Sequence, residues 1–337
     1  MRIGYLGAGA WGVCLASLLA KKGHDVVLWT IDPKAAKVLT ETRELPSLAG
    51  YKLDPRVTIT LDLATALDKV ELIVEGVTSA GMRPVFKMVK EIAVPTCPIV
   101  LTSKGIEQGT CMLLSEVVVD VLGNDCRHQV GCLIGPSLAE EVMKGHPTSV
   151  VCSSYRPDIK RIIQDAFSTP LLRVYPNDDM NGVQFGGAMK NIIALGCGIS
   201  DGLGFGDNTK AALMTRGLHE IRKLGAVKGC RPETLFGLAG MGDLCVTCMS
   251  TMSRNYRFGR LIGEGVSPEE AQAKVGGVVE GAYTCVSALQ LGKKEGKKED
   301  EIELPISEAV YSILYEKKDP REAVQCLLQR VAKEERQ

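Results

Sequence analysis

Short runs of β-branched and aliphatic residues alternate with helical patterns along the first half of the chain. Eight of these runs predict strands, at residues 3–6, 25–29, 57–60, 71–74, 99–102, 130–134, 149–152 and 171–175. Strands that alternate with helices are typical of βαβ units, in which helices cover both faces of a parallel sheet. The pattern therefore predicts an α/β fold built on a doubly wound, mostly parallel sheet.

Beyond about residue 177 the strand runs disappear and long helical patterns take over, at residues 182–199, 209–224, 268–275 and 306–315. A chain of 337 residues is also long enough for two domains of the usual size. We therefore expect a sheet domain at residues 1–177 and a mainly α-helical C-terminal domain at residues 178–337. A charged run at residues 292–303 predicts a solvated helix end or loop.

Composition narrows the class of protein. Hydrophobic residues make up 45% of the chain and charged residues 24%, a balance typical of a globular protein. Forty Lys and Arg residues stand against forty Asp and Glu residues, so no excess positive field attracts nucleic acid or an anionic membrane surface. Twelve cysteines without paired spacing indicate reduced, buried thiols rather than a disulfide framework, and they favour a cytoplasmic location.

The N-terminal segment 3–20 carries no charge and at first sight resembles a signal peptide or a short membrane anchor. Glycines interrupt it at Gly4, Gly7, Gly9 and Gly12, and no leucine-rich block precedes a small-residue cleavage site. No other apolar run approaches the roughly twenty residues needed to span a bilayer. We therefore expect a protein that is neither exported nor inserted into a membrane.

The same glycines predict a phosphate-binding turn. Residues 7–12 (GAGAWG) fit the pattern G-x-G-x-x-G and lie between a predicted strand and a predicted helix. In that context Gly7 permits a tight turn, Gly9 lets the backbone approach a pyrophosphate, and Gly12 lets the helix pack on the strand. The segment therefore predicts a Rossmann-like dinucleotide-binding domain, the alternative being a glycine-rich turn without a ligand.

The choice between NAD and NADP stays open in the sequence. Asp32 lies twenty residues after Gly12, where an acidic residue that binds the ribose is expected, but it is equally suited to cap a helix beginning at Pro33. No arginine stands nearby to bind a 2′-phosphate. We therefore expect NAD or NADP as the cofactor.

Lys190 is the first candidate for catalysis because it is the only charged residue in the helical pattern 182–200. Burial disfavours the charged form of a lysine and lowers its pKa, so that the ammonium can give a proton to a developing alkoxide. The alternative is a structural lysine that extends to solvent or pairs with a carboxylate. Asn191, the next residue, either orients a substrate or bonds the backbone.

An anion site is predicted further along the chain. Asp243 ends the glycine turn 240–243 (GMGD), and Ser253, Arg254 and Asn255 stand at the start of a predicted helix. Arg and Asn side chains donate hydrogen bonds to phosphate or carboxylate, and the N–H groups of a helix start add to them. The alternative is plain helix capping.

Two further loops follow strands of the predicted sheet. Lys104 lies in the segment 102–105 (TSKG), and Gly135 and Ser137 belong to the segment 135–137 (GPS). Ligands of open α/β sheets bind beyond the carboxyl ends of the strands, so we expect these loops to border the dinucleotide cleft. Each loop is also compatible with ordinary turn chemistry.

The sequence gives no indication of a metal site. Cys245 and Cys248 form the one C-x-x-C pair of the chain and lack the second pair that a zinc ribbon needs. The four histidines show no metal-ligand spacing. We therefore expect no metal cofactor.

Taken together, these motifs resemble those of the bacterial-type NAD(P)-dependent sn-glycerol-3-phosphate dehydrogenases along nearly the full length of the chain. They occur in the order GAGAWG, TSKG, GPS followed by AEE, GGAMKNIIALG, SDGLGFGDN, TRGL, GLAGMGDL, SRNYRFG and VVEG. A shared glycine turn alone would not produce that series. The resemblance implies a small-molecule substrate and a reversible reaction, in which a nicotinamide hydride reduces dihydroxyacetone phosphate to sn-glycerol 3-phosphate, a phospholipid precursor.

The resemblance also implies roles for single residues, with Lys190 as the proton donor and acceptor. The implied substrate contacts are Lys104, Gly135, Ser137, Lys190, Asn191, Asp243, Ser253, Arg254 and Asn255. The implied cofactor contacts are Gly7, Gly9, Ala10, Trp11, Gly12, Lys104, Ala139, Arg254, Val278 and Glu280. Ile31 stands where many relatives carry a basic residue, so a preference for NADPH does not carry over to this chain. Thr247 is suggestively placed after Asp243 to assist the lysine.

Two other functions stay in consideration. A β-hydroxyacid dehydrogenase of the 6-phosphogluconate type also places a lysine at the start of a helical domain, but it needs a carboxylate site, whereas segments 240–243 and 253–255 match the triose-phosphate family. A non-catalytic dinucleotide-binding redox sensor would need only the glycine turn. The family, and the frequency of symmetric dimers among soluble enzymes, suggest a homodimer.

Overall fold

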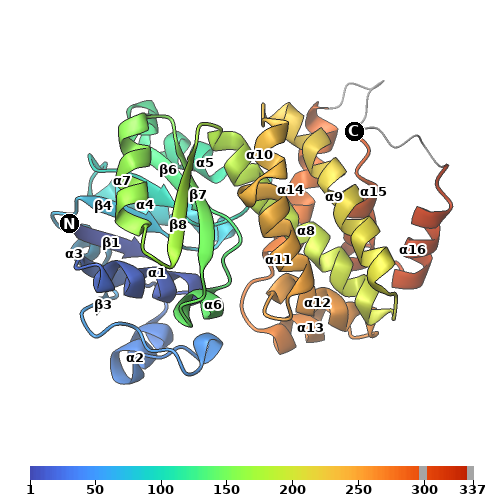
Figure 1. The fold of residues 1–337 in the computed structure, drawn as a ribbon, viewed down its shortest axis with the longest axis horizontal. Coiled ribbons are helices and arrows are strands. Elements are labelled where there is room, and N and C mark those ends of the chain that lie inside the picture. Colours follow the sequence, from blue (N-terminus) through green and yellow to red (C-terminus); the bar gives the residue numbers. More distant parts are fainter. Residues whose placement is uncertain (296–301, 332–337) are drawn as a thin grey trace.

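The chain folds into a sheet half and a helical half that lie side by side (Figure 1). The computed structural model describes residues 1–295 and 302–331. Residues 296–301, which belong to the charged run predicted to be a solvated helix end or loop, and residues 332–337 lie outside the described part. The N-terminus lies in the sheet half, and the last helices lie at the far side of the helical half.

All eight predicted strands are present, with ends that differ from the prediction by at most two residues. They are β1 (Arg2–Leu6), β2 (Asp25–Trp29), β3 (Thr58–Thr60), β4 (Leu72–Glu75), β5 (Ile99–Leu101), β6 (Val130–Ile134), β7 (Thr148–Ser154) and β8 (Leu172–Asn177). They form one sheet in the order β3-β2-β1-β4-β5-β6-β7-β8. The first six strands are parallel, β7 is antiparallel to β6, and β8 is parallel to β7. The prediction of a Rossmann-like, mostly parallel sheet is confirmed.

Helices cover both faces of this sheet. They are α1 (Ala10–Lys21), α2 (Pro33–Thr42), α3 (Leu63–Leu67), α4 (Met82–Ile92), α5 (Leu114–Leu122), α6 (Ala139–Met143) and α7 (Pro157–Phe167), with short turns η1 (Pro46–Leu48), η2 (Ser79–Gly81) and η3 (Asn124–Gln129). Leu15 of α1 and Phe167 of α7 belong to the apolar layer on one face. Phe86 of α4 and Val117 of α5 belong to the layer on the other face. The central strands are buried on both sides, as their continuous apolar runs predict.

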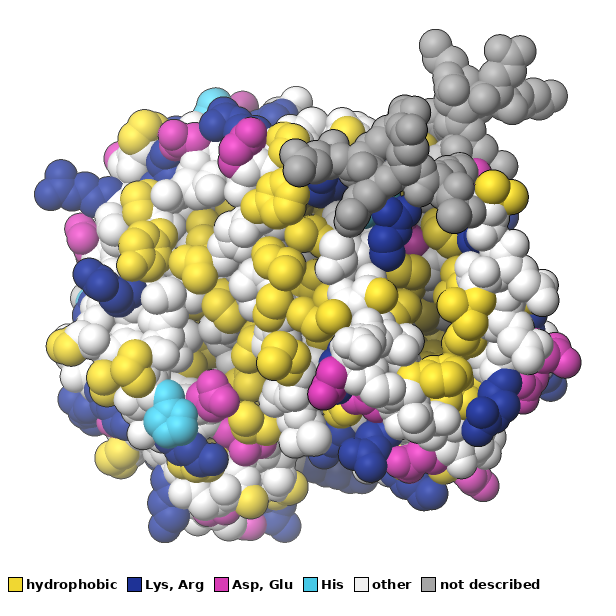
Figure 2. Space-filling model, turned by 45° about the vertical axis from the view of Figure 1, so that its right-hand side comes forward, with side chains coloured by type: hydrophobic (Ala, Val, Ile, Leu, Met, Phe, Trp, Pro, Cys, Tyr) yellow, Lys and Arg dark blue, Asp and Glu magenta, His cyan; other side chains and the backbone are white. Residues whose placement is uncertain are grey.

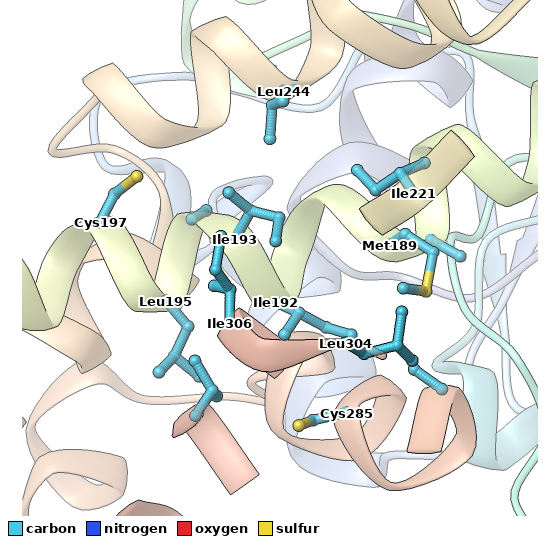
Figure 3. Packing of buried hydrophobic residues seen from close by; sticks show 14 of the residues in the cluster. Met189, Ile192, Ile193, Leu195, Cys197, Ile221, Leu244, Cys285, Leu304 and Ile306 are labelled. Carbon is cyan, nitrogen blue, oxygen red and sulfur yellow. The ribbon is translucent and has the colours of Figure 1, made fainter. Parts of the chain in front are cut away.

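The helical half is built around one long buried helix. Its elements are α8 (Met180–Gly202), α9 (Asp207–Val227), α10 (Pro232–Phe236), a π-helical turn η4 (Leu238–Gly242), α11 (Asp243–Met249), α12 (Arg254–Gly263), α13 (Pro268–Val275), α14 (Glu280–Glu295), α15 (Pro305–Tyr315) and α16 (Pro320–Leu328). Figure 3 shows Met189 and Leu195 of α8 among apolar side chains of neighbouring helices, such as Ile221 of α9 and Ile306 of α15. A helix that is apolar on all sides must be enclosed by other elements. The prediction of a mainly α-helical second half is confirmed.

Glycines allow α12 to lie close against α8. A Cβ atom at Gly198 of α8 would lie 2.1 Å from the carbonyl oxygen of Tyr256, and one at Gly259 of α12 would lie 2.1 Å from that of Leu195. Any side chain at these positions would push the two helices apart. The glycines therefore set the distance between α8 and the start of α12, where predicted site residues lie.

The surface carries charges of both signs. On the face shown in Figure 2, Lys and Arg side chains are interspersed with Asp and Glu side chains around apolar residues. Among the described residues, none of the helices combines the length and the apolar character needed to cross a bilayer.

Candidate active site

The glycine turn between β1 and α1 has the geometry that its spacing predicts. Gly7 has a φ of 113°, and a Cβ atom there would lie 2.5 Å from the carbonyl oxygen of Gly76. A Cβ atom at Gly12 would lie 2.2 Å from the carbonyl oxygen of Gly7. At Gly9, by contrast, nothing lies within 4 Å of the corresponding position. Gly7 and Gly12 close the turn, whereas Gly9 leaves the backbone open to a ligand.

The N-terminus of α1 suits the diphosphate of a dinucleotide. Gly9 precedes this helix and offers no side chain to bond its first N–H groups. Ala10 and Trp11, two of the expected cofactor contacts, form the first turn and are partly exposed. The first N–H groups of a helix have no partner within it, and the helix dipole adds positive charge there. An anion is therefore favoured at this point.

In the segment after β2, Asp32 fills one of the two roles that the sequence left open, that of a helix cap. Its Oδ1 atom accepts a hydrogen bond from the backbone N–H of Lys34 at 2.9 Å and so caps α2. Ile31, just before the cap, exposes 68% of its surface. An apolar side chain offers no charge to a 2′-phosphate. The geometry therefore adds no support for NADP over NAD.

Lys190 lies in the middle of α8 and is only 6% exposed. Its Nζ atom donates hydrogen bonds to Oδ1 of Asp243 at 2.5 Å and to Oγ1 of Thr247 at 2.6 Å. Burial lowers the pKa of Lys190 to about 8, although the Asp243 carboxylate favours the ammonium form. The lysine thus pairs with a carboxylate, one of the two possibilities that the sequence left open, and that carboxylate is itself an expected site residue.

Asp243 joins the two halves of the molecule. While its Oδ1 atom binds Lys190, its Oδ2 atom accepts a hydrogen bond at 2.6 Å from Nζ of Lys104, in the loop after β5. The same Nζ atom donates to the carbonyl oxygen of Gly135 at 3.0 Å, and Oγ of Ser137 also donates to that oxygen at 3.0 Å. Expected site residues from the TSKG, GPS, α8 and α11 segments therefore meet around one carboxylate.

Glycines explain how this carboxylate reaches Lys190. A Cβ atom at Gly240 of η4 would lie 2.0 Å from the carbonyl oxygen of Leu235, and one at Gly186 of α8 would lie 2.7 Å from the backbone of η4. Gly186 is four residues before Lys190 and therefore on the same side of α8. The absent side chains bring the π-helical turn onto α8 and place Asp243, the next residue, beside the lysine. Such widened turns are frequent at functional sites.

The start of α12 carries the residues expected to bind an anion. Oγ of Ser253 accepts a hydrogen bond from the N–H of Tyr256 at 3.2 Å, so this serine caps the helix, as the alternative prediction had it. The amide of Asn255 donates to Oδ1 of Asn191 at 3.0 Å and accepts from the N–H of Gly281 at 2.8 Å. Asn255 therefore ties α12 to α8 and α14.

Arg254 differs from its neighbours because no group of the described chain binds its guanidinium. The side chain is exposed, and within residues 1–295 and 302–331 it forms neither a hydrogen bond nor an ion pair. Gly277 leaves room for it, since a Cβ atom there would lie 2.6 Å from Nη1 of Arg254. An unengaged guanidinium at a helix start is able to bind phosphate through two parallel hydrogen bonds.

Glu280, at the start of α14, forms a second link between the halves. Its carboxylate accepts a hydrogen bond from the N–H of Ser79 at 3.2 Å and another from the hydroxyl of the same residue, in the turn after β4. Burial raises the pKa of Glu280, while the bonds from Ser79 favour its carboxylate form. Val278, two residues earlier, is exposed. Ala139 begins α6, which contacts α1.

Neighbouring loops connect the glycine turn to the lysine cluster. Gly7 abuts Gly76, which leads into the turn that contains Ser79. A Cβ atom at Gly105, next to Lys104, would lie 2.5 Å from Cβ of Ser79. Contacts therefore run from the glycine turn to the Lys104 loop and on to Asp243. In the part of the chain that is described, Ala139 and Val278 take no part in the hydrogen bonds around Asp243.

Sequence reasoning missed two polar residues near the carboxyl edge of the sheet, Glu75 and Ser79, and gave no role of its own to Ser103 of the predicted 102–105 loop. Ser79 binds Glu280, and Ser103 donates a hydrogen bond to Glu75 at 2.7 Å. The signal for Glu75 and Ser103 was a polar residue directly after a predicted strand end. Thr247, which the sequence suggests as a partner of the lysine, accepts a hydrogen bond from Lys190. No group of three or more His, Cys, Asp or Glu side chains within the described ranges is arranged to bind a metal ion.

Two family models match this chain. The model of the NAD-dependent glycerol-3-phosphate dehydrogenase N-terminus matches residues 2–160, and that of the C-terminus matches residues 179–325. A glycerol-3-phosphate dehydrogenase (NAD(P)+) of Protochlamydia amoebophila is 58% identical over 334 residues, 99% of each chain. One of Chlamydia felis is 52% identical, over 99% of this chain and 98% of the relative. A crystal structure of glycerol-3-phosphate dehydrogenase from Coxiella burnetii matches with a TM-score of 0.92 at 39% identity, over 98% of this chain and 99% of that chain.

Proposed function

This chain belongs to the NAD-dependent glycerol-3-phosphate dehydrogenase family, and from that premise we propose how the residues of its cleft carry out the family's reaction. The protein is an NAD(P)-dependent oxidoreductase that reversibly reduces dihydroxyacetone phosphate to sn-glycerol 3-phosphate, a phospholipid precursor. The observation that carries the proposal is the buried pair of Lys190 and Asp243, which Lys104 joins from the other half. When bound, the nicotinamide cofactor supplies the hydride.

The glycine turn is the part of the chain that holds the cofactor. Gly9, Ala10 and Trp11 present backbone N–H groups to its diphosphate, while Gly7 and Gly12 keep the turn tight. Ala139, Val278 and Glu280 are proposed as further cofactor contacts, which the family resemblance implies. The hydrogen bonds between Ser79 and Glu280 support a cofactor site that both halves build.

Lys190 is the proton donor in the reduction and the proton acceptor in the oxidation. Its ammonium has three N–H groups and two partners in the described chain, Asp243 and Thr247, so that one N–H is left for the substrate oxygen. As negative charge forms on that oxygen, the ammonium stabilises it and transfers a proton to it. A pKa of about 8 makes both forms of the lysine accessible near neutral pH.

Asp243 and Lys104 hold this proton donor in place. The Asp243 carboxylate offsets the unfavourable burial of the Lys190 ammonium and fixes its direction. Lys104 binds the other oxygen of that carboxylate and lowers the pKa of Lys190 further through its own positive charge. Gly135 and Ser137 complete the loop edge where the substrate contacts Lys104.

Arg254 binds the phosphate of the substrate. Its guanidinium is a charged group at the α12 start that forms no hydrogen bond or ion pair in the described chain, and phosphate is the charged end of the substrate. Asn191 and Asn255 hold α12 against α8 and so set the distance from Arg254 to Lys190. Anchoring the phosphate positions the ketone at the lysine, and positioning of this kind supplies much of the rate of an enzyme.

The test replaces the proton donor and follows NADH absorbance after dihydroxyacetone phosphate is added. Lys190→Met should lower kcat by about 10²–10⁴-fold, because general-acid assistance is typically worth that much. NADH binding, followed by fluorescence without substrate, should stay close to the wild-type value. Lys210→Met is the matched control, since Lys210 pairs with Asp201 at 2.6 Å inside the helical half. Unchanged turnover of Lys190→Met would overturn the role of the lysine.

We also propose a division into a dinucleotide-binding domain at residues 1–177 and a helical substrate and catalytic domain at residues 178–337. The end of β8 at Asn177 and the start of α8 at Met180 support this boundary. A cytoplasmic location is supported by the cysteines, nine of which are buried among the twelve. A homodimer is the commonest assembly for a soluble enzyme, and sedimentation velocity would test it.

A further inference from the structure

Glu75, the last residue of β4, is a buried carboxyl group to which the mechanism above gives no part. Its side chain is fully buried, and its strand neighbours are Leu6 of β1 and Leu101 of β5. Its Oε1 atom accepts two hydrogen bonds, from the N–H of Val77 at 2.6 Å and from Oγ of Ser103 at 2.7 Å. Its Oε2 atom has no hydrogen-bond partner in the described chain.

A carboxyl group at this position makes the sheet less stable than an apolar side chain would. A buried polar atom without a partner loses its hydrogen bonds to water and gains nothing in return. Burial raises the pKa of Glu75 to about 7, although the hydrogen bond from Ser103 favours the carboxylate. The preceding strand residues Ile73 and Val74 are buried and apolar, so a leucine at position 75 would complete the core. Packing of the core therefore does not account for a glutamate at position 75, which indicates another role for this residue.

One partner of Glu75 lies in the loop that binds the start of α14. Val77, whose N–H donates a hydrogen bond to Glu75, is two residues before Ser79. Ser79 donates both its N–H and its hydroxyl to Glu280, an expected cofactor contact. Glu75 therefore fixes the first residues of a loop whose end holds the helical half.

The other partner lies in the loop that binds the lysine cluster. Ser103 directly precedes Lys104, whose ammonium binds Asp243. The hydroxyl of Ser103 also lies in hydrogen-bond contact with the carbonyl oxygen of Val77, so that the two loops meet above the Glu75 carboxyl group. One buried oxygen of Glu75 thus accepts hydrogen bonds from both the Ser79 loop and the Lys104 loop.

We propose that Glu75 is a positioning residue, which ties the Ser79 loop to the Lys104 loop and so sets both at the correct distance from the helical half. It acts through Oε1 as a hydrogen-bond acceptor and does not contact the substrate. The proposal rests on the function proposed for the cleft. It gives a reason for a carboxyl group at the end of a strand that is otherwise apolar.

The first experiment compares Glu75→Leu with Glu75→Gln. The leucine variant has no acceptor and should lower kcat/KM for dihydroxyacetone phosphate by about 10–100-fold, the range expected when hydrogen bonds to a buried charged group are lost. It should also weaken NADH binding, measured by fluorescence without substrate, by roughly tenfold. The glutamine variant keeps a carbonyl oxygen as acceptor and should stay within about threefold of the wild type on both measures.

A matched control separates positioning from a loss of stability. Glu220 of α9 is also a buried glutamate whose pKa burial raises to about 7, but its partners lie in the helical half. Glu220→Leu should leave kcat and NADH affinity of the folded enzyme unchanged, whatever the change in its melting temperature. Equal kinetic losses in the two leucine variants would show that Glu75 is only structural and would overturn the proposal.

Alanine variants of Ser103 and Ser79 test the two loops separately. Ser103→Ala frees only the Lys104 loop and should lower kcat with little change in NADH affinity, whereas Ser79→Ala frees Glu280 and should mainly weaken NADH binding. These variants carry the test if Glu75→Leu does not fold. Wild-type kcat in Ser103→Ala together with wild-type NADH affinity in Ser79→Ala would overturn the proposal. NADH affinity is measured without turnover, so this outcome is distinct from unchanged turnover in Lys190→Met, which would overturn the proposed function.

Discussion

Lys190 and Glu220 are both buried ionisable side chains of the helical half, but their partners come from different places. Glu220 accepts hydrogen bonds from the N–H of Ile306 at 2.6 Å and from the N–H and hydroxyl of Ser307 at 3.2 and 2.9 Å. All of these donors belong to the start of α15, so Glu220 caps a helix within its own half. Lys190 binds Asp243, a carboxylate that a lysine of the sheet half also binds.

Under the proposed function, this difference separates a structural charge from a reactive one. Burial raises the pKa of Glu220 to about 7 and lowers the pKa of Lys190 to about 8, so both groups titrate near neutral pH. A shifted pKa alone therefore does not identify a catalytic group in this molecule. The origin of their partners distinguishes the two groups. Glu220 has both oxygens engaged by one helix end, whereas Lys190 has an N–H without a partner in the described chain, where the two halves meet.

Asp243→Asn should have the largest effect, because it removes the carboxylate that Lys104 and Lys190 share. The change leaves the ammonium groups of Lys104 and Lys190 without their shared counter-charge, and breaking a buried pair costs about 3–5 kcal/mol. We expect kcat/KM to fall by about 10²-fold or more through misplacement of the proton donor, together with a lower melting temperature. Steady-state kinetics and thermal unfolding measure the two effects.

The matched change is Asp201→Asn, which removes the partner of Lys210 inside the helical half. It should lower the melting temperature without a comparable loss of turnover. If Asp243→Asn instead kept activity within a few-fold of the wild type, Asp243 would be no more than a structural partner, like the groups around Glu220.

Arg254→Ala should affect substrate binding rather than the proton donor. A hydrogen bond to a charged group is worth about 1.5–3 kcal/mol, so KM for dihydroxyacetone phosphate should rise by about 10–100-fold. NADH affinity should change less. Arg260→Ala on the same helix is the control, because Arg260 pairs with Glu264 at 2.9 Å on the exposed side of α12. An unaltered KM in Arg254→Ala would contradict the phosphate site.

The pH dependence of the two reaction directions should mirror the pKa of Lys190. Ketone reduction needs the ammonium, so its kcat/KM should be level below about pH 8 and then fall by about tenfold per pH unit. Oxidation of sn-glycerol 3-phosphate needs the neutral amine, so its kcat/KM should fall by about tenfold per unit below the same pH. Measurement of both directions from pH 6 to 10 checks this, and a reduction rate that stays level up to pH 10 would speak against Lys190 as the acid.

Much of the sheet half follows from local sequence. Apolar runs predict the strands. The roles of Gly7, Gly9 and Gly12 follow from their spacing within one strand, turn and helix. The reversed direction of β7 and β8 was not predicted, because an apolar run shows that a strand is buried and says nothing about its direction.

The pairing within the cleft could be predicted only in part. The lone charge in the helical pattern 182–200 marked Lys190, and the GMGD turn marked Asp243. Nothing local shows that Lys104 binds that carboxylate from 139 residues away. Ser79 and Glu280 are 201 residues apart. Such contacts depend on how the halves pack, which the periodicity of single elements does not encode. Glu75 was missed for the same reason, since its partners lie in two separate loops.

Glu220→Gln tests the structural member of the Lys190–Glu220 comparison and should have the smallest effect of these changes, on stability alone. Because burial raises the pKa of Glu220 from its ordinary value of 4.5 to about 7, the folded state binds more protons than the unfolded state between these values. The favourable contribution of the neutral form is therefore complete below about pH 4.5 and is lost as the pH rises through about 7. Glutamine does not titrate, so the wild type should lose stability relative to the variant between pH 5 and 8, on the order of 1–2 kcal/mol.

The difference between the two unfolding curves isolates this group, because Glu75 titrates over a similar range in both proteins. Turnover should stay at the wild-type level, since the partners of Glu220 lie at the start of α15 and not in the cleft. If Glu220→Gln lowered kcat several-fold while the enzyme stayed folded, the α15 cap would be coupled to the proton donor. A charge bonded within one half would then be as important for catalysis as one shared between the halves.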